Sequence, residues 1–144
     1  MTSDEVIELL KQIRDLDHEL VSLRMELDHL SDGCHQVVNP TSPKVSSSKY
    51  NSHELALIKQ LEEKEKIAHA HNQCLDKRRK LVNLINLLKN PMERTILRLL
   101  FVNHLRTCDI TDRIDRGQSF IYRTRRAALK NLAEILTEES KKTS

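Results

Sequence analysis

The side chains best suited to chemistry lie between Arg116 and Lys130, near the carboxyl end of the chain. Five basic residues and no acidic residue occur from Arg116 through Ala133. Arginine and lysine neutralise phosphates, and glutamine and arginine can form paired hydrogen bonds with the edges of adenine and guanine. The stretch therefore predicts recognition of a polyanion, and double-stranded DNA is the expected partner.

Two sets of residues are expected to divide this recognition. A helix beginning at Gln118 would turn its first outward side chains toward base edges in the major groove. The expected base-reading residues are Gln118, Ser119, Tyr122 and Arg123. The basic residues around and beyond them are expected at phosphates, and these are Arg113, Arg116, Arg125, Arg126 and Lys130. A small three-helix packing module with a basic exterior remains the alternative.

A helix-turn-helix over residues 90–136 is predicted to position these side chains. Asn90 followed by Pro91 is a strong helix start, Thr107 can cap a short second helix, and Asp115–Gly117 suits a tight turn into the third helix. The expected inward residues are Met92, Ile96, Leu97, Leu100, Phe101, Ile110, Ile114, Ile121, Thr124, Ala128, Leu129, Leu132 and Ile135.

Residues 90–132 resemble the region-4-like helix-turn-helix of sigma factors, in the version found in small bacteriophage late-transcription regulators of the ArpU/RinA type. The resemblance is carried by Leu97-Arg98-Leu99, by Ile110 in the short helix, and by Ala128-Leu129-Lys130-Asn131-Leu132. The sequence departs from that pattern at Thr111, Asp115 and Gly117, where alanine, glycine and a serine or threonine cap are usual. Aspartate can adopt the left-handed turn conformation and glycine can act as a cap, so the fold is expected to survive.

The resemblance implies a sequence-specific transcription regulator, an activator of late genes in a phage or mobile element. It also implies contact with the host RNA polymerase and a location in the cytoplasm of the bacterial host cell. The positions matching the base-contacting residues of region 4 are again Gln118, Ser119, Tyr122 and Arg123.

The first helix, over residues 1–31, is predicted to be a dimerisation rod. Thr2 and Glu5 form a capping box, and apolar residues then alternate in steps of three and four. A homodimer or higher oligomer is expected through this stripe, and packing of the stripe against another helix of the same chain is the alternative. The stripe consists of Val6, Leu9, Ile13, Leu16, Leu20, Leu23, Leu27 and Leu30.

Three further segments complete the expected organisation. Asp32-Gly33 is expected to end the first helix, and residues 32–52, with Pro40 and Pro43, are expected to form a flexible linker. A second long helix over 53–89 should begin at a capping box of Asn51 and Glu54. Residues 137–144 are expected to be a disordered tail. The apolar stripe of the second helix is broken by polar residues, with Leu55, Ile58, Leu61 and Ala68 at one end and Leu75, Leu81, Val82, Ile85 and Leu88 at the other.

Charge is distributed unevenly along the chain. Residues 1–31 contain three basic and eight acidic side chains, whereas residues 76–136 contain fourteen basic and six acidic ones. Four consecutive positive residues, Lys77–Lys80, add to the basic half and either meet phosphate or form a solvated helix surface. The asymmetry is what a chain with one polyanion-binding end would show.

Enzymatic, metal-binding and membrane functions are not expected. The sequence has no glycine-rich phosphate loop and no GxSxG motif, and we expect no catalytic residue and no cofactor. His71 and Cys74 share a helix face, but no second pair at zinc-ligand spacing lies nearby, so no metal site is expected. No apolar run approaches the ~18–20 residues of a membrane span. Three separate cysteines, Cys34, Cys74 and Cys108, suggest a reducing compartment.

The composition predicts an all-α protein, because 31 % of residues are charged while only two glycines and four aromatic residues occur in 144. Two other functions remain open beside specific DNA reading. One is an adaptor that mimics sigma region 4 and binds RNA polymerase or another protein without reading DNA. The other is a nonspecific architectural DNA binder, which would show a steep salt dependence and no preferred sequence.

Overall fold

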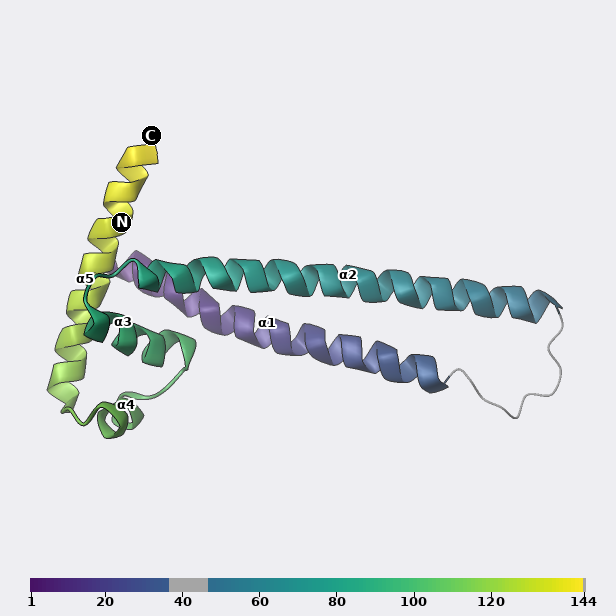
Figure 1. The fold of residues 1–144 in the computed structure, drawn as a ribbon, viewed down its shortest axis with the longest axis horizontal. Helices are drawn as coiled ribbons and strands as arrows, with labels where there is room; N and C mark the ends of the chain where they lie inside the picture. Colours follow the sequence, from purple (N-terminus) through teal and green to yellow (C-terminus); the bar gives the residue numbers. More distant parts are fainter. Residues whose placement is uncertain (37–46, 144) are drawn as a thin grey trace. The chain divides into compact units, whose positions relative to one another are not determined.

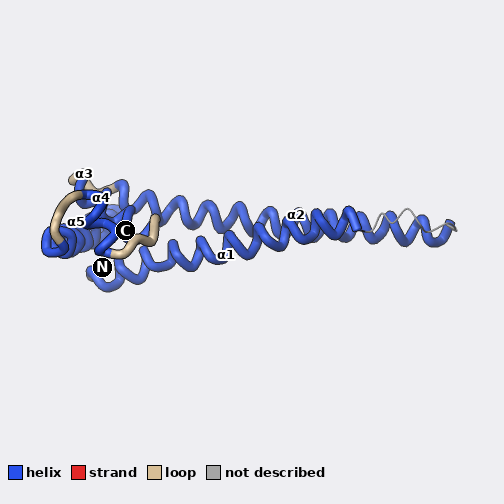
Figure 2. Tube along the Cα trace, turned by 90° about the horizontal axis from the view of Figure 1, so that it is seen from below, coloured by secondary structure: helices blue, strands red, loops and turns tan. Residues whose placement is uncertain are grey.

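The computed structural model describes the backbone of residues 1–36 and 47–143 and the side chains of residues 1–31 and 52–143. Every regular element in these residues is helical, and no strand occurs among them (Figure 2). The all-α prediction is confirmed. In chain order the elements are α1 (Ser3–Gln36), α2 (Ser47–Asn86), α3 (Pro91–Leu97), the π-helical turn η1 (Arg98–Val102), α4 (Thr107–Ile114) and α5 (Gln118–Thr143).

The chain divides into two compact units. Unit 1 consists of Met1–Asp17 and Asp76–Ser144, and unit 2 consists of His18–Leu75. Unit 1 therefore contains the start of α1, the end of α2 and all of the later elements, including the expected DNA-binding segment (Figure 1). None of the helices in the described parts of the chain combines the length and the apolar composition of a membrane span.

The first helix begins as predicted. The backbone N–H of Thr2 donates to Glu5 Oε2 at 2.9 Å, and the backbone N–H of Glu5 donates to Thr2 Oγ1 at 3.3 Å. These reciprocal bonds satisfy two amide groups that the helix itself leaves without partners. The predicted capping box is confirmed.

The ends of the two long helices differ from the predictions. α1 continues through Asp32 and Gly33 to Gln36, and α2 begins at Ser47, before Asn51. Glycine permits a left-handed stop but does not require one, and serine is well suited to a helix start. The predicted linker over 32–52 is therefore wrong at both ends, and its centre at 37–46 lies outside the described residues.

The tail predicted to be disordered at 137–144 is helical as far as Thr143, where α5 ends, and Ser144 lies outside the described residues. Leu136 is buried against the larger core, and Thr137 accepts a 2.9 Å hydrogen bond from the amino-terminal ammonium of Met1. Lys141 and Lys142 in the last turn face the negative end of the helix dipole. These contacts extend the helix beyond the predicted boundary.

Unit 1 has a larger core, built mainly from the start of α1, the end of α2 and α5. Val6, Leu10 and Ile13 of α1 are fully buried in it. The predicted stripe is thus used within the chain at Val6 and Ile13, as the internal-packing alternative described. Leu10, which the heptad pattern did not include, replaces Leu9 as the buried residue between them. The core residues outside α1 are Ile85, Leu88, Leu97, Ala128, Leu129, Leu132, Ala133 and Leu136.

A smaller core joins α3, α4 and α5 in unit 1. Ile96, Ile110 and Ile121 supply one fully buried side chain from each helix. Figure 1 shows α4 beside the beginning of α5, with α3 alongside. The inward residues predicted for 90–136 are all buried or half-buried, so the helical periodicity there is confirmed.

Unit 2 consists of the later part of α1 and the earlier part of α2, which run in opposite directions (Figure 1). Leu20, Leu23, Leu27 and Leu30 of α1 are half-buried. The apolar stripe predicted at the start of α2 is wrong, because Leu55, Ile58 and Leu61 are 59 %, 49 % and 58 % exposed. The half-buried positions lie two residues further along, at Leu57 and Gln60, so the inner face of this part of α2 is turned away from the predicted stripe. The α2 residues of unit 2 that are half-buried or buried are His53, Leu57, Gln60, Ile67, Ala68, Ala70, His71, Cys74 and Leu75.

Candidate nucleic-acid interface

The turn between α4 and α5 is set by Asp115. This residue is left-handed, with φ 60° and ψ 42°, and its backbone N–H donates to Thr111 O at 3.0 Å. Gly117 then acts as the cap of α5, because its carbonyl accepts from the N–H groups of Phe120 and Ile121 at 3.1 and 3.3 Å. The roles predicted for Asp115 and Gly117 at this turn are confirmed.

Of the caps predicted for α3 and α4, only the cap of α3 is found. The Asn90 side chain accepts a 3.0 Å hydrogen bond from the N–H of Met92, with Pro91 in the first helical position, so the predicted cap of α3 is confirmed. The predicted cap of α4 is wrong, because Thr107 is the first helical residue and Arg106 precedes it without a side-chain cap. A threonine can occupy the first helical turn without capping it, since a cap also needs an extended backbone.

The four predicted base-reading residues lie on the first two turns of α5, and all of them are exposed. Ile121 points into the smaller core, so its neighbours on the other side of the helix face solvent. Tyr122 is 52 % exposed, and Arg123 Nε approaches the backbone carbonyl of Ser119 at 3.4 Å. The structure thus brings Gln118, Ser119, Tyr122 and Arg123 together at one accessible end of α5.

The five predicted phosphate-contacting residues are placed differently from one another. Arg113, Arg116, Arg126 and Lys130 are exposed, whereas Arg125 is half-buried. The Arg125 guanidinium lies 6.0 Å from the centre of the Phe101 ring. The Arg116 guanidinium lies 4.9 Å from the centre of the Phe120 ring.

One exposed face of α5 carries three basic residues. Ser119, Arg123, Arg126 and Lys130 follow one another at spacings of four, three and four residues, which keeps them on one face of a helix. All four are exposed, and no acidic residue of α5 precedes Glu134. This face therefore presents hydrogen-bond donors and positive charge to a ligand.

A shallow groove runs beside this face. Phe120 and Arg123 of α5 border it on one side, and Asn90 at the start of α3 borders it on the other. Its remaining lining residues are Met92, Glu93, Thr124 and Ala127.

Glu93 fixes α3 against α5 in a way that the sequence did not reveal. Glu93 is 7 % exposed, and its two carboxylate oxygens accept from Asn131 Nδ2 at 3.1 and 3.2 Å. The sequence does not predict this contact. Their separation of 38 residues leaves no local pattern that would pair them.

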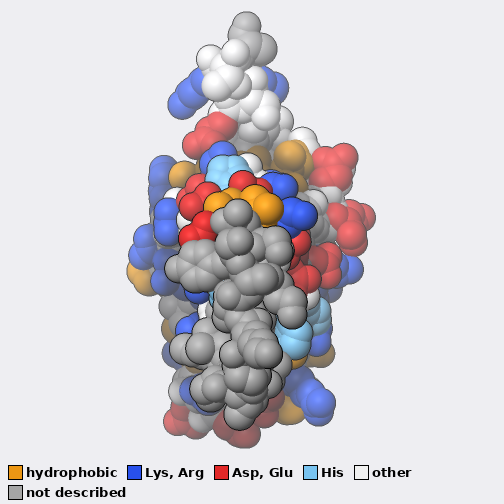
Figure 3. Space-filling view, turned by 90° about the vertical axis from the view of Figure 1, so that its right-hand side faces the viewer, with side chains coloured by type: hydrophobic (Ala, Val, Ile, Leu, Met, Phe, Trp, Pro, Cys, Tyr) orange, Lys and Arg blue, Asp and Glu red, His pale blue; other side chains and the backbone are white. Residues whose placement is uncertain are grey.

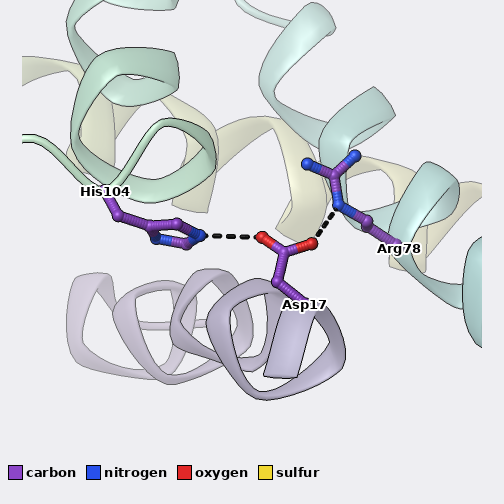
Figure 4. A network of polar contacts seen from close by, with 3 residues as sticks. All are labelled: Asp17, Arg78 and His104. Carbon is purple, nitrogen blue, oxygen red and sulfur yellow. Dashed lines mark hydrogen bonds and ion pairs between the residues drawn. The ribbon is translucent and has the colours of Figure 1, made fainter. Parts of the chain in front are cut away.

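A second polar contact joins three elements of unit 1 (Figure 4). Asp17 Oδ1 accepts from Arg78 Nε at 2.5 Å, and Asp17 Oδ2 lies 2.7 Å from His104 Nε2. Arg78 belongs to the run Lys77–Lys80, for which the sequence leaves phosphate contact and a solvated helix surface open, and here it pairs with a carboxylate of the same chain. Among the described residues, no group of three histidine, cysteine or acidic side chains is placed to hold a metal ion.

Comparison with known protein families places the chain in one of them. The family model described as "Protein of unknown function (DUF1492)" matches residues 39–133. The chain belongs to the DUF1492 family. The DUF1492 match covers all of α2, α3, η1 and α4, and α5 as far as Ala133, so it includes the candidate interface and leaves α1 outside. No curated protein and no solved structure matches the chain.

Proposed function

We propose that this chain is a transcription regulator that binds double-stranded DNA in a sequence-specific manner. The observation that carries the proposal is the exposed start of α5, where Gln118, Ser119, Tyr122 and Arg123 lie together. The short helix α4 and a left-handed turn precede this end, and the longer helix α5 carries it, which is the order of elements in a helix-turn-helix. The recognition helix of such a motif reads the major groove with its amino-terminal residues.

Electrostatics support DNA as the ligand. Arg116, Arg126 and Lys130 are exposed around the base-reading residues, and they offer contacts to phosphates on either side of a groove. Each neutralised phosphate releases counterions, so binding should weaken steeply as salt rises. Gln118 and Arg123 are the two side chains with the geometry for bidentate contacts, to adenine and guanine respectively.

The regulatory part of the proposal is an activator of phage or mobile-element late genes that acts with the host RNA polymerase. It rests on the resemblance of residues 90–132 to sigma region 4. A homodimer is the proposed active form, and a dimer would bind two half-sites related by symmetry. Sedimentation equilibrium tests that form directly, because a dimer has twice the 16.8 kDa mass of one chain.

The first test is selection of bound duplexes from a random-sequence DNA library at near-physiological salt. The Tyr122→Ala/Arg123→Ala double variant is selected in parallel, and Lys142→Ala, which removes one charge from the other end of α5, is the matched control. We expect a two-part motif from the parent and from the control, and loss of that motif in the double variant. Each good base contact removed should cost roughly 1–3 kcal/mol on the selected site. A folded parent that enriches no motif contradicts sequence-specific reading.

A protein-binding adaptor is the second candidate, and the surface of unit 2 favours it. Val21 and Met25 of α1 and Leu55, Ile58 and Leu61 of α2 are each exposed to water over about half of their surface or more. On the face drawn in Figure 3, hydrophobic side chains are exposed between charged side chains of both signs. Exposed large apolar groups are common at protein interaction sites. An adaptor would retain its partner after Tyr122→Ala/Arg123→Ala, whereas a DNA reader would lose its site.

A further inference from the structure

Two arginines of the candidate interface lie over aromatic rings, but in different surroundings. Arg116 is exposed and stands 4.9 Å from the centre of the Phe120 ring. Arg125 is half-buried and stands 6.0 Å from the centre of the Phe101 ring. A guanidinium within about 6 Å of a ring centre is attracted by the negative face of the ring. Both guanidinium groups are therefore positioned by an aromatic ring, but only Arg116 is exposed to solvent.

The position of Arg116 is fixed at both ends of its side chain. Its backbone lies between the left-handed Asp115 and the Gly117 cap, so the turn determines where the side chain begins. Its guanidinium ends over Phe120, whose ring is half-buried and packs against the smaller core. Phe120 thus connects the exposed charge to the packed interior of the module.

Such an arrangement favours binding by lowering its entropic cost. A free arginine has many rotamers and loses them when it meets a phosphate, whereas one that already rests on a ring loses fewer. The planar guanidinium can stack on the ring and still offer its edge donors to an anion. Arg116 also lies next to Gln118 and Ser119 in sequence, at the end of α5 that would enter the groove.

Arg125 has a different setting. It is on α5, and its ring partner Phe101 belongs to η1, so the contact ties the two elements together within unit 1. Phe101 packs against the larger core. Arg125 therefore contributes to packing between α5 and η1 and is poorly placed to donate to a ligand.

We infer that Phe120 is a positioning residue that holds Arg116 ready for a DNA backbone phosphate, whereas Arg125 joins α5 to η1 and contacts no phosphate. This inference rests on the proposed DNA-binding function. It divides two residues that the sequence treats alike, since both are arginines of one basic stretch.

The test is fluorescence anisotropy of the full chain with a mixed-sequence duplex over a series of salt concentrations. Arg116→Gln and Arg125→Gln form a matched pair, because each removes one charge and keeps an aliphatic stem. The logarithm of the binding constant should fall with the logarithm of salt less steeply in Arg116→Gln, by about one unit of slope. The slope of Arg125→Gln should equal that of the parent. An equal loss of slope in both variants, or in neither, overturns the inference.

The role of Phe120 is tested by a double-mutant cycle on the same duplex. Phe120→Leu should weaken binding about two- to five-fold when Arg116 is present. It should have no further effect in the Arg116→Gln background, because the group that it positions is absent. Phe120→Tyr, which keeps the ring face, should bind like the parent. Equal weakening by Phe120→Leu in both backgrounds would assign Phe120 to folding alone and overturn its positioning role.

Failure of the proposed function has a separate signature. A parent chain that shows no binding to the duplex at low salt contradicts both the DNA-binding function and the inference. A parent that binds with a steep salt dependence, together with variants that break the expected pattern, contradicts the inference alone. Circular dichroism of each variant at the assay temperature confirms that the compared chains are folded.

Discussion

Asp17 Oδ2 lies 2.7 Å from His104 Nε2, although 87 residues separate the two side chains in sequence. The same carboxylate receives Arg78 Nε at 2.5 Å, so one acidic group of α1 joins the end of α2 and the loop that follows η1 (Figure 4). Asp17 and Arg78 are 25 % and 30 % exposed at their side chains, which reduces screening of their charges by solvent. This contact ties the base of the long helices to the module that carries the candidate interface, all within unit 1.

Replacing Asp17 should therefore destabilise unit 1. Asp17→Asn removes the charge that both partners share, and we expect a loss of about 1–2 kcal/mol in the free energy of unfolding. Urea denaturation followed by circular dichroism measures it. Asp15→Asn, at an exposed position of the same helix, is the control and should change stability by less than about 0.5 kcal/mol. Equal effects of the two substitutions would mean that the contact contributes nothing beyond helix charge.

The left-handed backbone of Asp115 makes a second prediction. Valine at this exposed position should cost about 1–2 kcal/mol, because a branched side chain collides with the backbone at positive φ. Asp115→Gly should be neutral or slightly stabilising. The control is Asp112→Val in the helical part of α4, where the expected cost is at most about 0.7 kcal/mol. Thermal unfolding of the three variants compares them, and a larger cost at Asp112 than at Asp115 would contradict the turn geometry.

Gly117 should tolerate a side chain. A Cβ built there meets nothing within 4 Å, and the residue does not have a positive φ. Gly117→Ser adds a hydroxyl that can cap α5 and should raise stability by a few tenths of a kcal/mol. Gly117→Leu is the control, because it adds a side chain that has no hydrogen-bond acceptor. It should not stabilise the protein. Differential scanning calorimetry resolves the comparison, and marked destabilisation by serine would contradict the open site.

The contact between Glu93 and Asn131 makes the fourth prediction. Asn131→Ala removes the donor and leaves a largely buried carboxylate without this partner, at a cost of about 1–3 kcal/mol. Asn131→Asp should cost more, since it adds a like charge beside Glu93. Chemical denaturation gives both values. A milder effect of aspartate than of alanine would show that Glu93 is not held as the distances indicate.

The features that the sequence predicted correctly are local ones. The cap at Asn90, the capping box of Thr2 and Glu5 and the turn at Asp115 each depend on residues within a few positions of one another. The inward residues of α3, α4 and α5 follow from helical periodicity, which also placed the four base-reading residues on the outside of α5. Local rules of this kind act before any tertiary contact forms, so they can be read along the chain.

The features that the sequence did not predict depend on distant contacts. The pairing of Asp17 with His104 and that of Glu93 with Asn131 join residues 87 and 38 positions apart. Leu10 is buried in place of Leu9 because the start of α1 packs on the larger core and not along a heptad seam. Arg116 and Arg125 were indistinguishable because only the packing of Phe120 and Phe101 gives them different surroundings.

α5 spans both cores of unit 1 without a break, since it contributes Ile121 to the smaller core and Leu129, Leu132 and Leu136 to the larger one. One residue inserted in an α-helix rotates all later residues about the helix axis by about 100° and shifts them along it by about 1.5 Å. An insertion between Ile121 and Leu129 would therefore rotate the buried side chains of one core out of that core. The number of residues in α5 between the two cores is therefore fixed. It also sets the direction in which the exposed basic face of α5 points relative to the larger core.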